Sequence, residues 1–371
     1  MTADAPAAPP QRPSAARRLA IAQKLGGLAP ALMTAVFAFL MGGAVVAATG
    51  HNPIEAYQGI FKGAGLNWFF HLPWNTNTDA LDTYNLTQTL LQTSSLILCG
   101  LAVAFAFRCG LFNIGGQGQY MVGLIVANWV GISLVDASKP LHIVLAVAAA
   151  TLAGAVWGGI AGFLRATVGA HEVISTIMLN WIAYWFGSYV FGQGGPLQNP
   201  ATPTNPISAD VAPSARLPVW WGDSTLQGLH IGFFVAIAAL FVYWFILNRT
   251  TLGYEVRATG YNPDAAAYGG VSVKRSFFLA MAISGAFAGL AGGLDMLGYL
   301  FRFGTLDVQS NSIGFMAIAV ALLGRNSAVG VFFSAILFGG LLYGTTKGLD
   351  PNVFNPTLAG NLTSMIQGLV V

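Results

Sequence analysis

The chain has 371 residues, of which 55% are hydrophobic and 8% are charged, with a formal net charge of +3. Its mean hydropathy is +0.65. Soluble domains carry about 25% charged residues, so this composition excludes a single soluble core. The composition predicts an all-α, polytopic bundle of transmembrane helices, and the 46 glycines suit helices that pack closely in lipid.

The first 24 residues differ from everything that follows. They are rich in Ala and Pro and then become basic. We interpret residues 1–24 as a disordered cytoplasmic tail. A cleavable signal is not expected, because the apolar run that follows is too long and lacks a clear small-residue cleavage site. Residues 25–371 are expected to form a single transmembrane domain.

The apolar runs predict about ten membrane-crossing or broken helices. Runs of full spanning length lie at 28–49, 86–107, 114–134, 141–164, 173–191, 229–247 and 277–298. The runs at 312–323 and 328–343 are shorter than the ~20 residues of a full span, so each is a short helix or the two form a broken unit around 324–326. The run at 357–371 is an incomplete span: either the natural protein is longer, or this helix ends within the membrane.

The basic residues predict the orientation. With the N-terminus in the cytoplasm, eleven of the sixteen Lys and Arg residues fall on the inside of the membrane. This excess follows the positive-inside rule, and the opposite orientation would reverse it. We therefore expect a cytoplasmic N-terminus.

One polar island, residues 249–275, interrupts the apolar pattern. Its charged members are Arg249, Glu255, Arg257, Asp264, Lys274 and Arg275. The island is too short to be a domain, and an Ala-rich helix is expected at 264–268. We interpret it as a cytoplasmic surface on which a soluble partner acts.

Catalytic and metal-site patterns are absent from the sequence. It contains no GxxxxGK[ST] and no HExxH, and its five histidines are scattered without ligand spacing. Cys99 and Cys109 lie about 15 Å apart on one helical run, too far for a disulfide. We expect no enzyme activity, no cofactor and no metal in this chain. We also expect lipid around it, no nucleic-acid partner, and hydrolysis by another subunit if ATP drives its function.

A glycine-rich segment at 107–119 carries Asn113, Gln117 and Gln119 at the entrance to a span. Buried amides cost free energy unless they are hydrogen-bonded. Glycines allow a helix to unwind and offer its backbone to a solute. We favour a solute pathway here, and the alternative is that the amides join helices to each other.

Further amides lie inside the apolar runs. Gln88 and Gln92 are one helical turn apart, so both can face one cavity. Asn180 precedes Trp181, a pairing that suits a ring-bearing or sugar solute through hydrogen bonds and stacking. We place all four residues in the predicted solute pathway. Interhelical hydrogen bonding is the alternative, and for Asn128 it is the preferred interpretation.

A single carboxylate, Asp295, lies near the outer end of the run at 277–298. It either extends to the outer interface or lines a water-filled path. A secondary transporter driven by an ion gradient is the alternative function, and Asp295 is almost its sole candidate relay. Glycines four residues apart at 285–293 and 154–162 predict close-packing helix faces, within the chain or between subunits.

Two long outer loops, 50–85 and 192–228, are rich in aromatic residues. These residues are Trp68, Phe69, Phe70, His71, Trp74, Trp220 and Trp221. Such side chains usually anchor a protein at the membrane interface. A docking surface for an external binding protein is the alternative.

Several segments together resemble a known family. They lie at 110–119, 172–180, 257–270 and 317–326, with a further match at 52–57. The chain is similar to the permease subunits of bacterial ATP-binding-cassette (ABC) importers, in the branched-chain amino acid and simple-sugar family, and most similar to the nucleoside and simple-sugar branch. The likeness runs from about residue 28 to the end. Gln117 stands where that family usually has an acidic residue.

The resemblance implies a bacterial inner-membrane importer of nucleosides or related simple sugars that works by alternating access. It implies a second permease subunit, identical or homologous, two cytosolic ATPases and an external solute-binding protein or lipoprotein. It also implies that the island contains the segment that couples the permease to its ATPase. The coupling residues would be Arg257, Asn262, Asp264, Ala265, Ala266, Tyr268 and Gly269.

Overall fold

The computed structural model describes residues 33–70, 79–223 and 227–349, together with the single positions 361, 365 and 368. The predicted tail at 1–24, the loop residues His71 and Trp74, and nearly all of the run at 357–371 lie outside the described residues.

Helices dominate the described residues. In chain order the elements are a helix over Met33–Ala48, α2 (Pro53–Gly63), α3 (Asn67–Phe70), α4 (Asp79–Arg108), α5 (Gly116–Ser133), α6 (Lys139–Val168), α7 (Glu172–Phe191), β1 (Val219–Trp221), β2 (Leu229–His230), α8 (Gly232–Arg249), α9 (Thr251–Tyr261), α10 (Pro263–Tyr268), α11 (Val273–Asp295), the π-helical turn η2 (Met296–Leu300), α12 (Thr305–Ser310), α13 (Ile313–Leu323) and α14 (Ala328–Gly348). Strands β1 and β2 form a small antiparallel hairpin.

The predicted polytopic helical bundle is confirmed, although the count differs. Within the described residues, seven helices are long and apolar enough to cross a membrane, or eight if Met33–Ala48 and Pro53–Gly63, bent by 119°, form one broken span. Helix α5 has 18 residues and forms at a predicted span. It is not among the seven, since its first turn contains two glutamines. The predicted tenth segment falls outside the described residues.

The last helices differ most from expectation. Helix α14 extends over 21 residues and is a full span, so the prediction of a short apolar helix was wrong. Near its polar end the hydroxyls of Thr345 and Thr346 donate to the carbonyls of Leu341 and Leu342, at 2.6 and 2.8 Å, so both hydroxyls are hydrogen-bonded within the helix. Before it, α12 and α13 together form a 19-residue unit that breaks at Asn311–Ser312.

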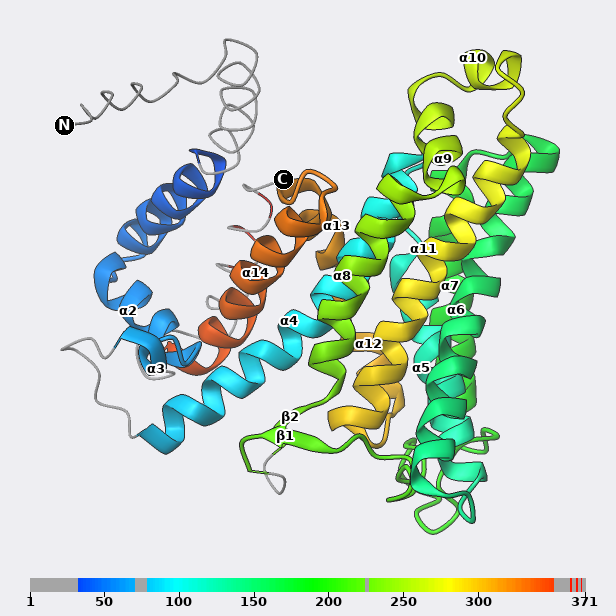
Figure 1. Ribbon diagram of the computed structural model, residues 1–371. Coiled ribbons are helices and arrows are strands. Elements are labelled where there is room, and N and C mark those ends of the chain that lie inside the picture. Colours follow the sequence, from blue (N-terminus) through cyan, green and yellow to red (C-terminus); the bar gives the residue numbers. More distant parts are fainter. Residues whose placement is uncertain are drawn as a thin grey trace, which may run out of the picture.

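Helix α4 runs obliquely through the centre of the molecule (Figure 1). On one side lie α2, α3 and α14, and on the other lie α5, α6, α7 and α11. The best 18-residue window of α4 is 83% buried, against 28% for α6 and for α8. A helix that is apolar on all sides is suited to this central position.

Helices α6 and α11 pack backbone against backbone through their glycines. A Cβ placed on Gly154 would lie 2.3 Å from the Gly285 carbonyl oxygen, and one on Gly289 would lie 2.8 Å from the Cα of Gly154. The predicted close-packing faces are thus confirmed, and they meet each other within this chain.

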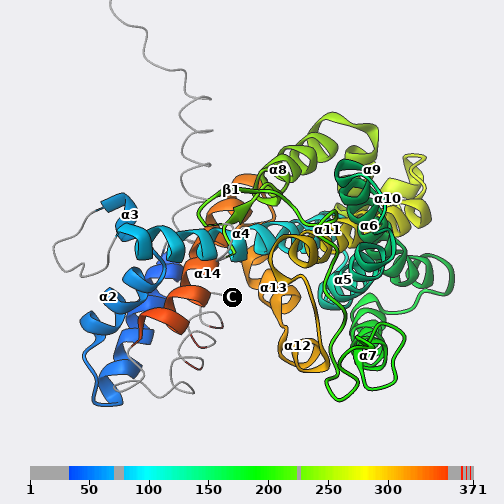
Figure 2. The same cartoon turned by 90° about the horizontal axis from the view of Figure 1, so that it is seen from below.

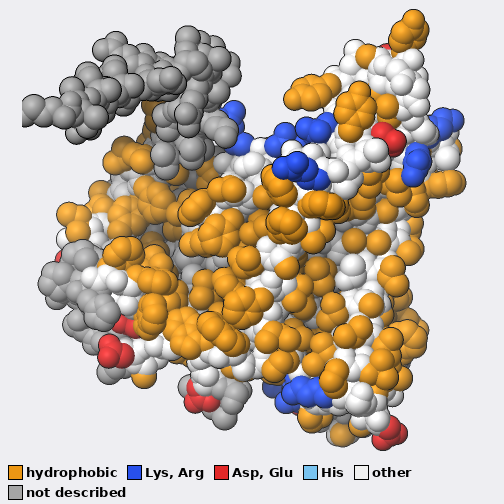
Figure 3. Space-filling view, in the orientation of Figure 1, with side chains coloured by type: hydrophobic (Ala, Val, Ile, Leu, Met, Phe, Trp, Pro, Cys, Tyr) orange, Lys and Arg blue, Asp and Glu red, His pale blue; other side chains and the backbone are white. Residues whose placement is uncertain are grey.

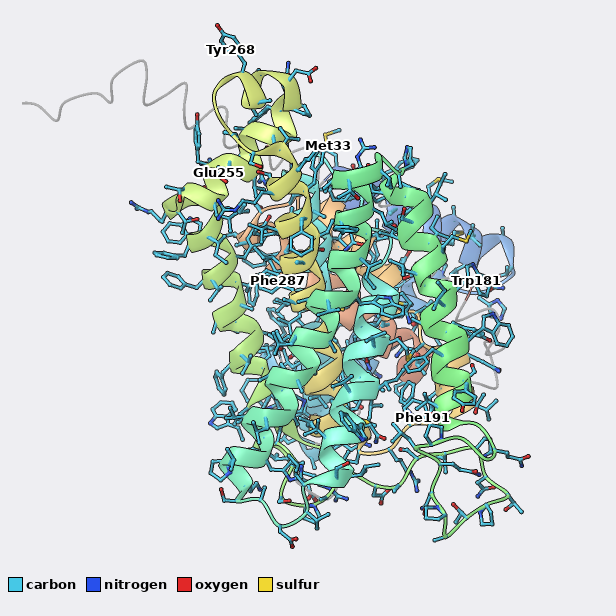
Figure 4. The ribbon with its side chains drawn as sticks, turned by 90° about the vertical axis from the view of Figure 1, so that its right-hand side faces the viewer. Met33, Trp181, Phe191, Glu255, Tyr268 and Phe287 are labelled. Carbon is cyan, nitrogen blue, oxygen red and sulfur yellow. The ribbon has the colours of Figure 1, made fainter. Side chains whose placement is uncertain are left out.

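The two ends of the bundle differ in character. Helices α9 and α10 project at one end, where several Lys and Arg side chains gather (Figure 3). Met33 lies toward the same end as Tyr268 (Figure 4). The long loop before α8 and the β1–β2 hairpin lie at the opposite end (Figure 1).

The charged island is more ordered than predicted. The short Ala-rich helix is confirmed as α10, but the preceding α9 was missed. Thr250 caps α9, accepting a hydrogen bond from the amide of Gly253 at 3.1 Å. Gly253 and Val256 are buried, so α9 packs one face against the bundle.

Candidate functional sites

A cavity of about 330 Å³ lies between α4, η2, α14 and the break between α12 and α13. Its polar lining includes Gln92, Tyr299, Asn311, Tyr343 and Thr346. Amide, phenol and hydroxyl groups thus face one space beside apolar side chains. Such a mixture suits a neutral, hydrogen-bonding solute.

A second cavity, of about 390 Å³, lies between α5, α7 and the other side of the same break. It is lined by Gln117, Asn180 and Trp181, together with Tyr184 and Phe315. The Trp181 and Tyr184 rings meet edge to face at 5.7 Å. Amides and aromatic rings therefore converge here, and Asn180 and Trp181 are among them.

Asn311 and Ser312 line both cavities. Helices α12 and α13 lie between α14 on one side and α5 and α7 on the other (Figure 2). Gln117 holds the break in place: its Nε2 donates to the Asn311 carbonyl at 2.9 Å and to Asn311 Oδ1 at 3.0 Å, while its Oε1 accepts from the Gly314 amide at 2.8 Å. Neither Asn311 nor Ser312 was predicted, although both stand in a polar interruption of the apolar pattern.

Asn113 and Gln119 form a separate, buried network. Their side-chain amides exchange hydrogen bonds of 2.9 and 3.1 Å. Asn113 also donates to Ser284 Oγ at 2.7 Å and accepts from the Gly115 amide at 2.9 Å. Neither amide is part of the lining of the two cavities. They join α5 and α11 and hold the turn that leads into α5.

Gln88 and Gln92 do not face one cavity. Gln88 Nε2 donates to the Gln227 carbonyl, beside the hairpin, at 2.8 Å. Gln227 in turn donates to the Tyr299 carbonyl at 3.2 Å. Of the two predicted glutamines, Gln92 lines the first cavity, and Gln88 holds the loop that carries Gln227.

Both polar atoms of the Asn180 side-chain amide are hydrogen-bonded. Its Oδ1 accepts from the Gly118 amide at 2.8 Å, and its Nδ2 donates to the Ile114 carbonyl at 2.9 Å. These bonds tie α7 to the start of α5. Trp181, the next residue, is 56% exposed and forms the open wall of the second cavity.

Asp295 does not reach the outer interface. It is 2% exposed and accepts hydrogen bonds from Ser95 Oγ at 2.5 Å and from the Tyr120 hydroxyl at 2.7 Å. The carboxylate therefore joins α4, α5 and α11 through two buried hydroxyls.

The tip of the charged island is α10. Asn262 caps this helix, with its Oδ1 accepting from the amides of Asp264 and Ala265, both at 3.0 Å. Ala266 is buried, whereas Tyr268 is 98% exposed and stands at the far end of the molecule (Figure 4). The seven predicted coupling residues thus lie on α9, on α10 and at the caps of α10.

Metal chemistry has no visible place in the described part of the chain. No group of three or more His, Cys, Asp or Glu side chains there could hold a metal ion. Cys99 and Cys109 are free and buried, as predicted.

A helical bundle with polar cavities inside and a projecting helix at one end defines a membrane transport protein. The chain belongs to the family described as the branched-chain amino acid transport system permease component, whose model matches residues 85–371.

Three relatives agree with this assignment. The guanosine ABC transporter permease protein NupP of Bacillus subtilis is 38% identical over 87% of this chain and 86% of its own length. The nucleoside ABC transporter permease protein NupB of Lactococcus lactis is 37% identical, with the same coverage. The glucose ABC transporter permease protein TsgB13 of Haloferax volcanii is 33% identical over 83% of this chain and 79% of its own length. No solved structure matches the chain.

Proposed function

We propose that this chain is the permease subunit of an ATP-driven importer of nucleosides or related simple sugars in a bacterial inner membrane. The observation that carries the proposal is the pair of cavities on either side of Asn311–Ser312, lined by amides and aromatic rings. The names of the relatives supply the solute class.

The solute pathway is built from two groups of residues. Gln92, Gln117, Asn180 and Trp181 face the cavities, where amides bond the edge of a base or the hydroxyls of a sugar and the ring stacks on its face. The remaining predicted members, Gln88, Asn113 and Gln119, support this lining from behind.

Energy enters through the coupling segment. Arg257, Asn262, Asp264, Ala265, Ala266, Tyr268 and Gly269 dock on a cytosolic ABC ATPase, which binds and hydrolyses the ATP. The exposure of the aromatic Tyr268 supports this role, since a bare aromatic ring at a helix tip is typical of a protein contact. This chain needs no cofactor, and its N-terminus is cytoplasmic, on the ATPase side.

Two further proteins complete the transporter. A second permease, identical or homologous, covers the face on which the cavities open. An extracytoplasmic binding protein or lipoprotein delivers the solute at the opposite end. There Trp68 and Trp221 pack edge to face at 5.2 Å, joining the two aromatic loops into one surface.

The test measures uptake by the complex in proteoliposomes. A labelled nucleoside should accumulate when ATP is supplied on the coupling side, and an ionophore should leave this uptake unchanged. Uptake that survives without ATP but is lost with the ionophore would overturn the proposal.

A double variant tests the coupling role. D264A/Y268A should reduce uptake to background, because it removes the charge and the ring from the tip of α10, while the binding protein still docks. The matched control is D136A, which changes an exposed carboxylate in the α5–α6 loop and should transport normally. Normal uptake by D264A/Y268A would refute the coupling role.

A further inference from the structure

Arg108, the last residue of α4, grips the turn between α13 and α14. Its Nε and Nη2 donate to the Asn326 carbonyl at 3.0 and 2.8 Å. The Tyr243 hydroxyl of α8 donates to the same oxygen at 2.7 Å. Three donors from two helices therefore converge on one backbone oxygen. Hydrogen bonds from a charged donor are the stronger kind.

The turn that is gripped is strained. Arg325 and Asn326 have φ angles of 52° and 51°, in the left-handed region. Non-glycine residues rarely adopt this region, and two in succession persist when surrounding contacts hold them. The Arg108 and Tyr243 bonds are such contacts.

The coupling segment touches the same end of α4. A Cβ placed on Gly260 of α9 would lie 2.3 Å from the Arg108 carbonyl oxygen, so the two backbones are in direct contact. A Cβ placed on Gly253, two turns earlier on the same face, would lie 2.1 Å from the Ile246 carbonyl oxygen of α8. Helix α9 thus rests on the two helices whose side chains grip the turn.

We infer that Arg108 is the positioning residue that joins the coupling segment to the solute cavities. A shift of α9 displaces the end of α4, Arg108 carries the shift to Asn326, and α13 passes it along its 11 residues to the break at Asn311–Ser312. A short helix with a gripped turn at one end and a break at the other can move as a rigid body. This inference rests on the proposed function.

The functional experiment compares uptake with ATP hydrolysis in the reconstituted complex. R108K keeps the charge but replaces the planar two-donor fork with a single ammonium. It should leave assembly and ATP hydrolysis intact while lowering the solute imported per ATP by about tenfold, the loss of roughly one charged hydrogen bond. Y243F should cause a smaller loss of the same kind. The control K139A, which removes an exposed cation at the start of α6 and outside the island, should behave as wild type.

A wild-type ratio of uptake to hydrolysis in R108K would overturn the inference, as would an equal fall in both activities. A second measurement needs no transport. Spin labels at Y268C and F315C, on α10 and α13, should report one narrow distance in the purified chain, and R108K should broaden it. An unchanged distance distribution in R108K refutes the role of Arg108 in joining the coupling segment to α13, even if the complex imports nothing. Absence of ATP-driven uptake by the wild type refutes the proposed function instead.

Discussion

The amide of Gln117 is bonded at both of its ends. Its nitrogen donates to both oxygens of Asn311, and its oxygen accepts from the Gly314 amide. A Cβ on Gly314 would lie 2.4 Å from the Gln117 backbone, so α5 and α13 touch here. Gln117 therefore holds together the break that separates the two cavities.

The Gln117–Asn311 pair predicts a specific double-mutant result. In Q117E, Asn311 can turn its amide to donate to the new carboxylate. In N311D, Gln117 still donates. N311D should therefore keep at least about half of wild-type uptake, since one charged hydrogen bond replaces a neutral one. Q117E also loses the donation from Gln117 Nε2 to the Asn311 carbonyl and should retain less. Q117E/N311D places two carboxylates side by side with no donor between them, and its uptake should fall about tenfold below the product of the single effects. The measurement is the uptake rate of the wild type, both single variants and the double variant at matched expression. If the rate of the double variant equals the product of the single effects, the two side chains do not act together.

The close glycine packing between α6 and α11 predicts that a Cβ added at this contact lowers the stability of the protein. G154A introduces a Cβ 2.3 Å from the Gly285 carbonyl, and the backbones must separate. We expect a loss of about 2 kcal/mol, as for overpacked cores. G340A is the matched control within a spanning helix, because its Cβ would meet nothing closer than 3.9 Å. Thermal unfolding in mild detergent should show a lower Tm for G154A than for the wild type. The Tm of G340A should be unchanged. Equal Tm values would mean that this contact adds little.

The elements also show what sequence patterns can and cannot predict. Lipid demands long apolar helices, so the main spans and the small-residue faces could be read from the chain. Helix α9 could not, because its buried face consists of Gly253, Val256 and Thr259, and of these only Val256 carries an apolar signal. The extension of α14 could not be read either, because its last turn contains Thr345, Thr346 and Lys347, which end the apolar run.

The candidate site was predicted less well for a physical reason. Buried amides look alike in a sequence, and tertiary contacts decide their roles. Gln88 and Gln92 are one turn apart, yet a carbonyl 139 positions away captures Gln88. Asn113 and Gln119 satisfy each other, whereas Gln117, between them in sequence, lines a cavity. Asn311 and Ser312 matter because they lie where two cavities meet, a feature that no local pattern encodes.

Two surfaces of the molecule are suited to contact with other proteins. At one end the exposed α10 carries Tyr268, and two polar cavities lie on either side of the break between α12 and α13. A permease that worked alone would leave both surfaces without a partner. Purification of the tagged full-length chain from its native membrane in mild detergent should therefore recover a P-loop ATPase and a second permease, identical or homologous.

One variant should lose the ATPase and keep the second permease. D264A/Y268A alters the tip of α10 and leaves the cavity face intact, so it should lose the ATPase and retain the second permease. The relative amounts of the three proteins, measured by quantitative mass spectrometry, distinguish this from general unfolding, which would lose both. If the wild-type chain is recovered alone, stable and repeatedly, neither surface is an interface and the ATP-driven assembly is refuted. If the variant loses both partners although its Tm in detergent equals that of the wild type, unfolding is excluded, and ATPase docking must precede pairing of the permeases.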